Sequence, residues 1–201
     1  MSGAAIPQTM EDESFEAEAR TGWLSWTSPV DHKQLGIMYL LGAFFFFIVG
    51  GVLALMMRVQ LAVPNNHFVT PEIYNQLFTM HGTTMVFLVL VPLLIGFATY
   101  MGPLMIGARD MAFPRLNALS FWVQILGGVM LYFSFATGAT NLGGAPDAGW
   151  FSYAPLSEKA FSFTSGIDYW IVGLLGIGIG TLGAGINIIA TIICLRAPGM
   201  T

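Results

Sequence analysis

Four long stretches of this 201-residue chain contain no Asp, Glu, Lys or Arg. They cover residues 34–57, 73–108, 116–146 and 169–195. Each can supply the roughly 20 consecutive apolar residues that a helix needs to cross a bilayer. Only 9% of all residues are charged, against about a quarter in an average soluble domain. The sequence therefore predicts an all-α integral membrane protein with four transmembrane helices.

The spans are expected near residues 36–58, 78–101, 118–140 and 168–194. Loops that carry Lys and Arg tend to stay in the cytoplasm, so positive charges predict the orientation. With a cytoplasmic N-terminus, five of the seven cations share the inner side: Arg20, Lys33, Arg109, Arg115 and Arg196. The acidic residues 1–22 then form a solvated, disordered cytoplasmic tail.

A histidine, His81, lies inside the second charge-free stretch. A side chain that can ionise or bind metal is costly in a membrane, which makes it a functional candidate. Its imidazole could bind a metal such as haem iron or could hydrogen-bond a neighbouring helix. Position alone favours neither. The expected spans put His81 in about the first turn of the second helix, level with Arg58 near the outer face. A cation beside a histidine suits a strongly polar or anionic ligand between them.

A second candidate group lies on the inner side. Asp110 is in the short loop between the second and third spans, and Asn117 follows seven residues later. Two helical turns separate such positions, so they would share one face. An exposed carboxylate below a polar side chain could begin a water-filled proton path. Spacing favours the alternative that Asp110 caps the third helix, with Pro114 in its first turn. His32 and His67, each taken alone, indicate surface positions.

Several function classes lack support in the sequence. The single cysteine excludes an internal disulfide, and no Cys-x-x-Cys motif indicates a zinc or iron–sulfur site. No glycine-rich loop indicates nucleotide binding, and nothing indicates nucleic acid as a partner. No charged residue lies in the middle of a span, which argues against a transporter with a coupling site at the midplane.

Five ordered segments are similar to the start of subunit I of the haem–copper respiratory oxidases (cytochrome c oxidase subunit I). They are residues 30–39, 74–82, 103–117, 149–156 and 196–201. The resemblance implies that residues 23–201 form the first four helices of a twelve-helix bundle. The chain is then expected to be the N-terminal portion of that catalytic subunit. The copper ligands, the oxygen-binding haem ligand and the second axial histidine come later in the family, so this portion alone would lack the oxygen-reducing centre.

The resemblance also implies roles for single residues. His81 matches an axial ligand of the low-spin haem iron, expected to be haem a, and Arg58 and Tyr74 join it as cofactor-binding residues. Asp110 matches the mouth of a D-type proton channel. The further channel positions are Asn117, Asn187, Thr99, Tyr39 and His32. No residue of this portion is expected to be catalytic. The complete subunit would also hold a high-spin haem and a copper ion.

The chain departs from the family pattern at several positions. Thr99 stands where a third channel asparagine is expected, and Gly180 and Thr181 stand where a serine pair lines the channel. A hydroxyl can still hold water, so an altered but working channel is expected. Gln60 replaces an acidic residue that many members use for a structural cation, which argues against a calcium or sodium site.

The electron donor is predicted from three apolar positions. Quinol-using members carry polar side chains where this chain has Val49, Leu53 and Ile73. Since a bound quinol needs polar partners, cytochrome c is favoured as the donor. A quinol-oxidising enzyme is the alternative, because residues 196–201 look more like that branch. A non-catalytic haem-binding membrane subunit is another, with His67 as its only outer second ligand.

The implied function is proton-pumping reduction of oxygen to water, with electrons arriving through the low-spin haem. Expected partners are the remaining part of subunit I, a copper-carrying subunit II, subunit III, cytochrome c and membrane lipid. The expected location is the inner (plasma) membrane of a bacterium, with several passes and a cytoplasmic N-terminus.

Overall fold

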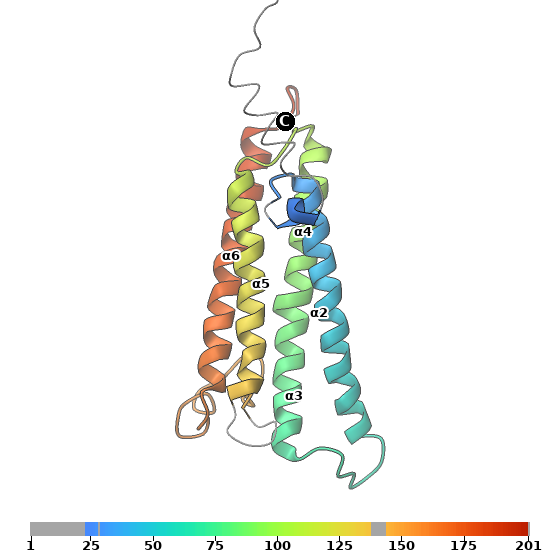
Figure 1. The fold of residues 1–201 in the computed structure, drawn as a ribbon, viewed down its shortest axis with the longest axis vertical. Coiled ribbons are helices and arrows are strands. Elements are labelled where there is room, and N and C mark those ends of the chain that lie inside the picture. Colours follow the sequence, from blue (N-terminus) through green and yellow to red (C-terminus); the bar gives the residue numbers. More distant parts are fainter. Residues whose placement is uncertain (1–22, 28, 138–143, 201) are drawn as a thin grey trace, which may run out of the picture.

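The computed structural model describes residues 23–27, 29–137 and 144–200, and within these ranges every regular element is a helix. The expected tail, residues 1–22, and the expected end of the third span at residue 140 lie outside the described residues. Long helices run side by side along the longest axis of the molecule (Figure 1). This arrangement confirms the prediction of an all-α bundle.

Four helical segments are long and apolar enough to cross a membrane. The first is α2 (His32–Gln60), which follows the short helix η1 (Trp23–Trp26). The second is a continuous rod of α3 (Pro71–Thr83), the π-helical segment η2 (Thr84–Leu90) and α4 (Val91–Ile106). The third is α5 (Pro114–Phe133) with η3 (Ser134–Thr137), and the fourth is α6 (Gly166–Cys194).

The second rod begins at Pro71, seven residues before the expected start of its span. The Thr70 side chain caps it by accepting a hydrogen bond from the Ile73 N–H at 3.3 Å. Proline suits the first turn because its missing N–H would have no helical partner there. His81 therefore lies ten residues into the rod, and the expectation that it occupies the first turn is wrong.

A π-helical segment interrupts this rod at Thr84, three residues after His81. At its end the Val91 N–H bonds to the Val86 carbonyl, five residues back. Pro92 follows, and a proline has no N–H and crowds the carbonyl four residues before it. Widening the helix to the longer bonding pattern accommodates that ring. Such segments are frequent at functional sites.

Polar side chains anchor the start and end of α2. The Asp31 side chain accepts a hydrogen bond from the Lys33 N–H at 2.7 Å. Partial burial raises the pKa of Asp31, but this hydrogen bond and the nearby Lys33 charge outweigh it, so the net pKa is lowered. At the other end the Gln60 amide bonds Asn66 O and Val69 N, which holds the following loop close to the end of α2.

The four long helical segments pack as two antiparallel pairs, and the two pairs contact each other. α2 runs along the rod of α3, η2 and α4, and glycine permits the contact, because a Cβ at Gly96 would lie 2.9 Å from Tyr39 Cβ. α5 runs along α6, where a Cβ at Gly127 would lie 2.7 Å from the Gly173 carbonyl oxygen. α4 contacts α6, and α2 contacts α5.

The surface of the bundle is apolar and its interior is partly polar. Large exposed hydrophobic side chains occur on every long helix, among them Phe44, Leu94, Leu126 and Leu182. Buried polar side chains face inward, among them Thr83, Thr99, Asn117, Gln124 and Asn187. A protein in lipid distributes its side chains in this way, because no water covers its outer face.

We call the two ends of the bundle the Asp110 end and the Arg58 end. The Asp110 end holds the starts of α2 and α5 and the ends of α4 and α6, and it is uppermost in Figure 1. The Arg58 end holds the opposite termini of these helices.

Candidate functional site

An ion-pairing contact at the Asp110 end joins the loop before α5 to the first residue of α2. Asp110 Oδ1 lies 3.2 Å from His32 Nδ1, and it also accepts the Met111 N–H at 2.7 Å. The carboxylate is 40% exposed, whereas the His32 side chain is 2% exposed. The surface position expected for His32 is therefore wrong. A chain of two contacting groups leads from the surface into the bundle, where His32 Nε2 has no partner among the described residues.

Asp110 does not cap α5. The N-cap position belongs to Phe113, which makes no side-chain cap of its own. Side chains of α6 satisfy the free N–H groups instead: Asn187 Oδ1 accepts from Phe113 N at 2.8 Å, and Thr191 Oγ1 accepts from Ala112 N at 2.9 Å. The capping interpretation is thus wrong, and so is the helical-face argument, because Asp110 lies in the loop before the helix.

Asn187 and Asn117 differ in how their amides are used. Asn187 also donates from Nδ2 to the Phe113 carbonyl at 3.1 Å, so both ends of its amide hold the start of α5. Asn117 is fully buried, yet neither atom of its amide has a partner within the described parts of the chain. Both ends of the Asn187 amide are hydrogen-bonded to the backbone of Phe113. The Asn117 amide has no partner among the described residues, so it could bind water.

Asn117 is the first of several buried polar side chains that lack partners among the described residues. We call them the polar column: Asn117, Ser120 and Gln124 on α5, Tyr39 on α2 and Thr99 on α4. The three α5 members lie three and four residues apart, on one helix face, over about 10 Å of helix. Tyr39 meets this region through Phe121, with ring centroids 5.0 Å apart.

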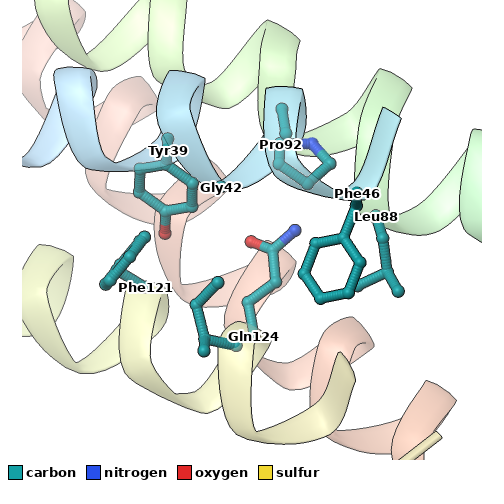
Figure 2. Close-up of a pocket in the computed structure, with 9 residues that line it drawn as sticks. Tyr39, Gly42, Phe46, Leu88, Pro92, Phe121 and Gln124 are labelled. Carbon is teal, nitrogen blue, oxygen red and sulfur yellow. The ribbon is translucent and has the colours of Figure 1, made fainter. Parts of the chain in front are cut away.

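Three members of the column match the sequence-based channel positions and two do not. Asn117, Thr99 and Tyr39 were expected there. Ser120 and Gln124 were not, although each is a polar residue inside a charge-free stretch, and that is the signal that could have identified them. A small cavity lies at the column's far end, and Figure 2 shows the Gln124 amide directed into it beside Tyr39 and Phe46.

A different geometry surrounds His81. Its Nδ1 lies 2.9 Å from the Gly50 carbonyl oxygen on α2, so Nδ1 carries the proton and donates it. Nε2 is left as the free nitrogen and has no partner among the described residues. Metal-binding histidines commonly have this arrangement, because the second hydrogen bond fixes the tautomer and the ring orientation. The ring is half-buried.

Neighbouring residues hold α3 in place around His81. Thr79 Oγ1 accepts the Gly149 N–H at 2.9 Å, and Thr83 Oγ1 accepts the Trp170 indole N–H at 3.1 Å. The intervening Gly82 leaves room for Trp150, whose Cδ1 would lie 3.1 Å from a Cβ at that position. The turn that carries His81 is therefore fixed to α6 and to the loop before it.

Arg58 and Tyr74 both lie nearer the Arg58 end of the bundle than His81 does. Gly50 precedes Arg58 by eight residues, or about 12 Å of helix. The His81 ring contacts α2 at Gly50, so the expectation of equal depth with Arg58 is wrong. Arg58 is exposed, and no carboxylate of the described residues lies within ion-pair distance of it. Tyr74 is half-buried in the first turn of α3.

His67 lies far from His81. It is exposed in the loop that Gln60 holds near the end of α2. His81 is about 15 Å along the rod from Pro71, the residue where that loop gives way to helix. The described residues contain no group of three or more His, Cys, Asp or Glu side chains able to hold a metal. His81 thus offers one coordination position, and His67 does not complete it.

Comparison with known proteins identifies the family. Residues 34–201 match the family described as cytochrome c and quinol oxidase polypeptide I. The chain is 48% identical over 199 residues to cytochrome c oxidase subunit 1 of Corynebacterium glutamicum, which covers 99% of this chain and 33% of that protein. It is 52% identical over 187 residues to cytochrome c oxidase subunit 1 of Bacillus subtilis, covering 92% of this chain and 29% of that protein.

A quinol oxidase is among the relatives as well. Quinol oxidase subunit 1 of Bacillus subtilis is 48% identical over 179 residues, covering 89% of this chain and 27% of that protein. The chain spans about a third of the length of these relatives, or less. Bacterial relatives and four membrane-spanning helices together indicate a multi-pass bacterial membrane protein. The match extends over most of the chain and includes both kinds of oxidase, and on that basis the chain belongs to the family of cytochrome c and quinol oxidase polypeptide I.

Proposed function

We propose that this chain forms part of the catalytic subunit of a proton-pumping terminal oxidase, which takes electrons from cytochrome c and reduces oxygen to water. Family membership supports the oxidase class. The observation that carries the proposal is the 2.9 Å contact between His81 Nδ1 and the Gly50 carbonyl, which leaves Nε2 free for a metal. The remaining oxidase subunits, including subunits II and III, would complete the assembly.

His81 would hold the iron of a low-spin haem through Nε2. A haem bound there supplies reversible one-electron transfer at a potential that its axial ligand tunes. The hydrogen bond to Gly50 would make the imidazole a stronger ligand and keep its ring in one orientation. Arg58 would stabilise negative charge at the haem edge, since it has no acidic partner of its own among the described residues.

Asp110 would collect protons at the cytoplasmic side, with the N-terminus of the chain on that same side. Its carboxylate is exposed and contacts His32, which leads inward to buried groups. Asn117, Thr99 and Tyr39 would bind water along the path. Asn187 would act differently, by holding the loop that carries Asp110 against α6.

The packing around α2 favours cytochrome c over quinol as the donor. Leu53 is buried in the larger apolar core cluster, and Ile73 packs against it. A quinol would need polar side chains where these residues fill space. Turnover of the assembled enzyme with each donor in turn distinguishes the two. Faster oxidation of quinol than of cytochrome c would replace this donor with the alternative.

The central experiment replaces His81 with Ala in the assembled oxidase. The low-spin haem absorbance should disappear, while a matched His67→Ala variant should keep it. An unchanged spectrum in His81→Ala would refute haem ligation. Loss of the haem in His67→Ala would favour the alternative of a separate haem-carrying subunit.

A further inference from the structure

We propose that Tyr132 is a positioning residue for His81 and acts through the side chain of Thr84. The Tyr132 hydroxyl selects one rotamer of Thr84. In that rotamer the Thr84 methyl sets the distance at which α2 presents the Gly50 carbonyl to the His81 ring. The positioning stands on the geometry alone. Its effect on a haem rests on the proposed function, because it needs His81 as an iron ligand.

The Thr84 hydroxyl is held by another helix. Its oxygen lies 2.6 Å from the Tyr132 hydroxyl, which belongs to α5. Four other helical threonines donate instead to the carbonyl four residues back in their own helix: Thr79, Thr83, Thr181 and Thr191. A threonine in a helix divides between two rotamers, because its hydroxyl can bond such a carbonyl. The Tyr132 hydroxyl therefore decides which rotamer Thr84 adopts.

Thr84 lies in the turn that follows His81 and contacts the residue that His81 bonds. The Thr84 N–H bonds the carbonyls of Met80 and His81, and its side chain is fully buried. A Cβ at Gly50 would lie 3.2 Å from Thr84 Cγ2. The methyl thus limits how closely α2 approaches at Gly50, whose carbonyl accepts the His81 Nδ1–H at 2.9 Å.

The Tyr132 ring is itself fixed against α2. It stacks on Phe46, with ring centroids 5.8 Å apart and planes 29° apart. Phe46 precedes Gly50 by four residues, so both lie on one face of α2. Tyr132 therefore contacts α2 one helical turn before Gly50, while its hydroxyl holds Thr84 beside Gly50.

This arrangement keeps the His81 hydrogen bond at a favourable length. Its 2.9 Å lies at the usual optimum for an N–H···O bond, so a change of spacing in either direction weakens it. A weaker bond makes the imidazole less basic. A less basic axial ligand stabilises ferric iron less, and the reduction potential of a haem held there would rise.

Tyr132→Phe removes the hydroxyl and keeps the ring that stacks on Phe46. In the assembled oxidase Thr84 should then occupy both rotamers. The low-spin haem should stay bound with a broader, shifted absorbance, and the equilibrium constant for its reduction should rise several-fold. Tyr169→Phe is the matched control, because that hydroxyl makes no hydrogen bond to the described residues and its ring packs on Phe133 of α5. An unshifted potential in Tyr132→Phe, or an equal shift in both variants, would overturn the proposal.

A second substitution tests the rotamer mechanism by rescue. Valine strongly prefers one rotamer in a helix and has a methyl on each branch of Cβ. In the double variant Tyr132→Phe, Thr84→Val, a methyl should face Gly50 without any hydrogen bond, and the potential should return toward its native value. A purely packing role of Tyr132 would not be rescued at Thr84, so a potential that stays shifted would refute the mechanism.

Thr84→Ser provides a further measurement if Tyr132→Phe does not assemble. Serine keeps the hydroxyl for Tyr132 but lacks the methyl that contacts Gly50. The potential should rise here as well, and a native potential would overturn the proposal.

The His81→Ala variant separates this inference from the proposed function. If His81→Ala loses the low-spin haem and Tyr132→Phe leaves the potential unshifted, haem ligation stands and the positioning role falls. If His81→Ala keeps the haem, ligation fails, and a map of the Tyr132→Phe oxidase decides the structural part. Two Thr84 rotamers and a changed distance from His81 Nδ1 to the Gly50 carbonyl oxygen are expected, whereas native geometry in that map would overturn the inference.

Discussion

Asp110 Oδ1 lies 3.2 Å from His32 Nδ1, although the two residues are 78 positions apart. The contact joins the loop before α5 to the first residue of α2. It also joins an exposed carboxylate to a buried ring. Burying an imidazole is unfavourable unless its nitrogens find partners, and Asp110 supplies one for Nδ1, so the contact supports the proposed role of His32 in a path inward from Asp110.

Asp110→Asn tests this relationship. The amide oxygen can still accept the Met111 N–H, so the loop should keep its conformation while the carboxylate is lost. Proton uptake by the assembled oxidase in vesicles should slow, with haem absorbance retained. Asp31→Asn is the matched control, because that carboxylate is also near His32, at 3.9 Å, and asparagine caps a helix as well as aspartate. Full uptake in Asp110→Asn would refute the path.

The two asparagines at proposed channel positions should respond differently to substitution. Asn187→Ala leaves the Phe113 N–H unpaired, which should cost about 1–3 kcal/mol. Asn117→Leu removes an amide that has no partner among the described residues, so its cost in stability should be small. Thermal unfolding of the 201-residue chain in detergent measures both. Equal destabilisation by the two changes would contradict the assignment of Asn187 to a backbone role.

The sequence predicts the helices well because charge is expensive in lipid. Four charge-free stretches were enough to identify four spans, and the observed helices contain the expected ones through all their described residues. The expected start of the second span lies seven residues after the observed start of the rod, because residues 71–77 are more polar than a typical membrane-spanning segment. Thr70 and Pro71 indicate the start of this helix better, because Thr70 caps it and Pro71 lies in its first turn.

The site was only partly predictable from sequence. Asn117, Thr99 and Tyr39 were singled out because they match a family pattern and lie inside expected helices, and the structure buries all three, while their channel role stays a prediction. The contact between His32 and Asp110 depends on the packing of α2 beside the α4–α5 loop, and no local spacing encodes it. Gln124 could not be predicted because a single amide in an apolar helix has no motif; only its burial without a partner among the described residues singles it out.

The glycines of α6 provide a test of packing. At Gly173 a Cβ would lie 2.7 Å from the Gly127 carbonyl oxygen and 2.7 Å from Leu131 N, both of them backbone atoms of α5. Backbone cannot move aside as a flexible side chain can, so Gly173→Ala should destabilise the chain by about 3 kcal/mol. At Gly178 a Cβ would have no neighbour within 4 Å, so Gly178→Ala should be neutral or slightly stabilising. Unfolding of the 201-residue chain in detergent compares the two, and similar stabilities would contradict the close α5–α6 contact.

Two adjacent glycines on α2 test the contact that orients His81. A Cβ at Gly50 would lie 3.0 Å from Met85 Cε and 3.2 Å from Thr84 Cγ2, and the Thr84 hydroxyl is held 2.6 Å from the Tyr132 hydroxyl. Methionine can yield but the held threonine cannot, so Gly50→Ala should push α2 away and lengthen the His81–Gly50 hydrogen bond. A weaker bond lowers ligand basicity, so a low-spin haem held by His81, as proposed, should stay bound in the assembled oxidase with a shifted absorbance and potential. Gly51→Ala has no neighbour within 4 Å and should leave both unchanged. Identical spectra and potentials for the two variants would show that the Gly50 carbonyl does not tune His81.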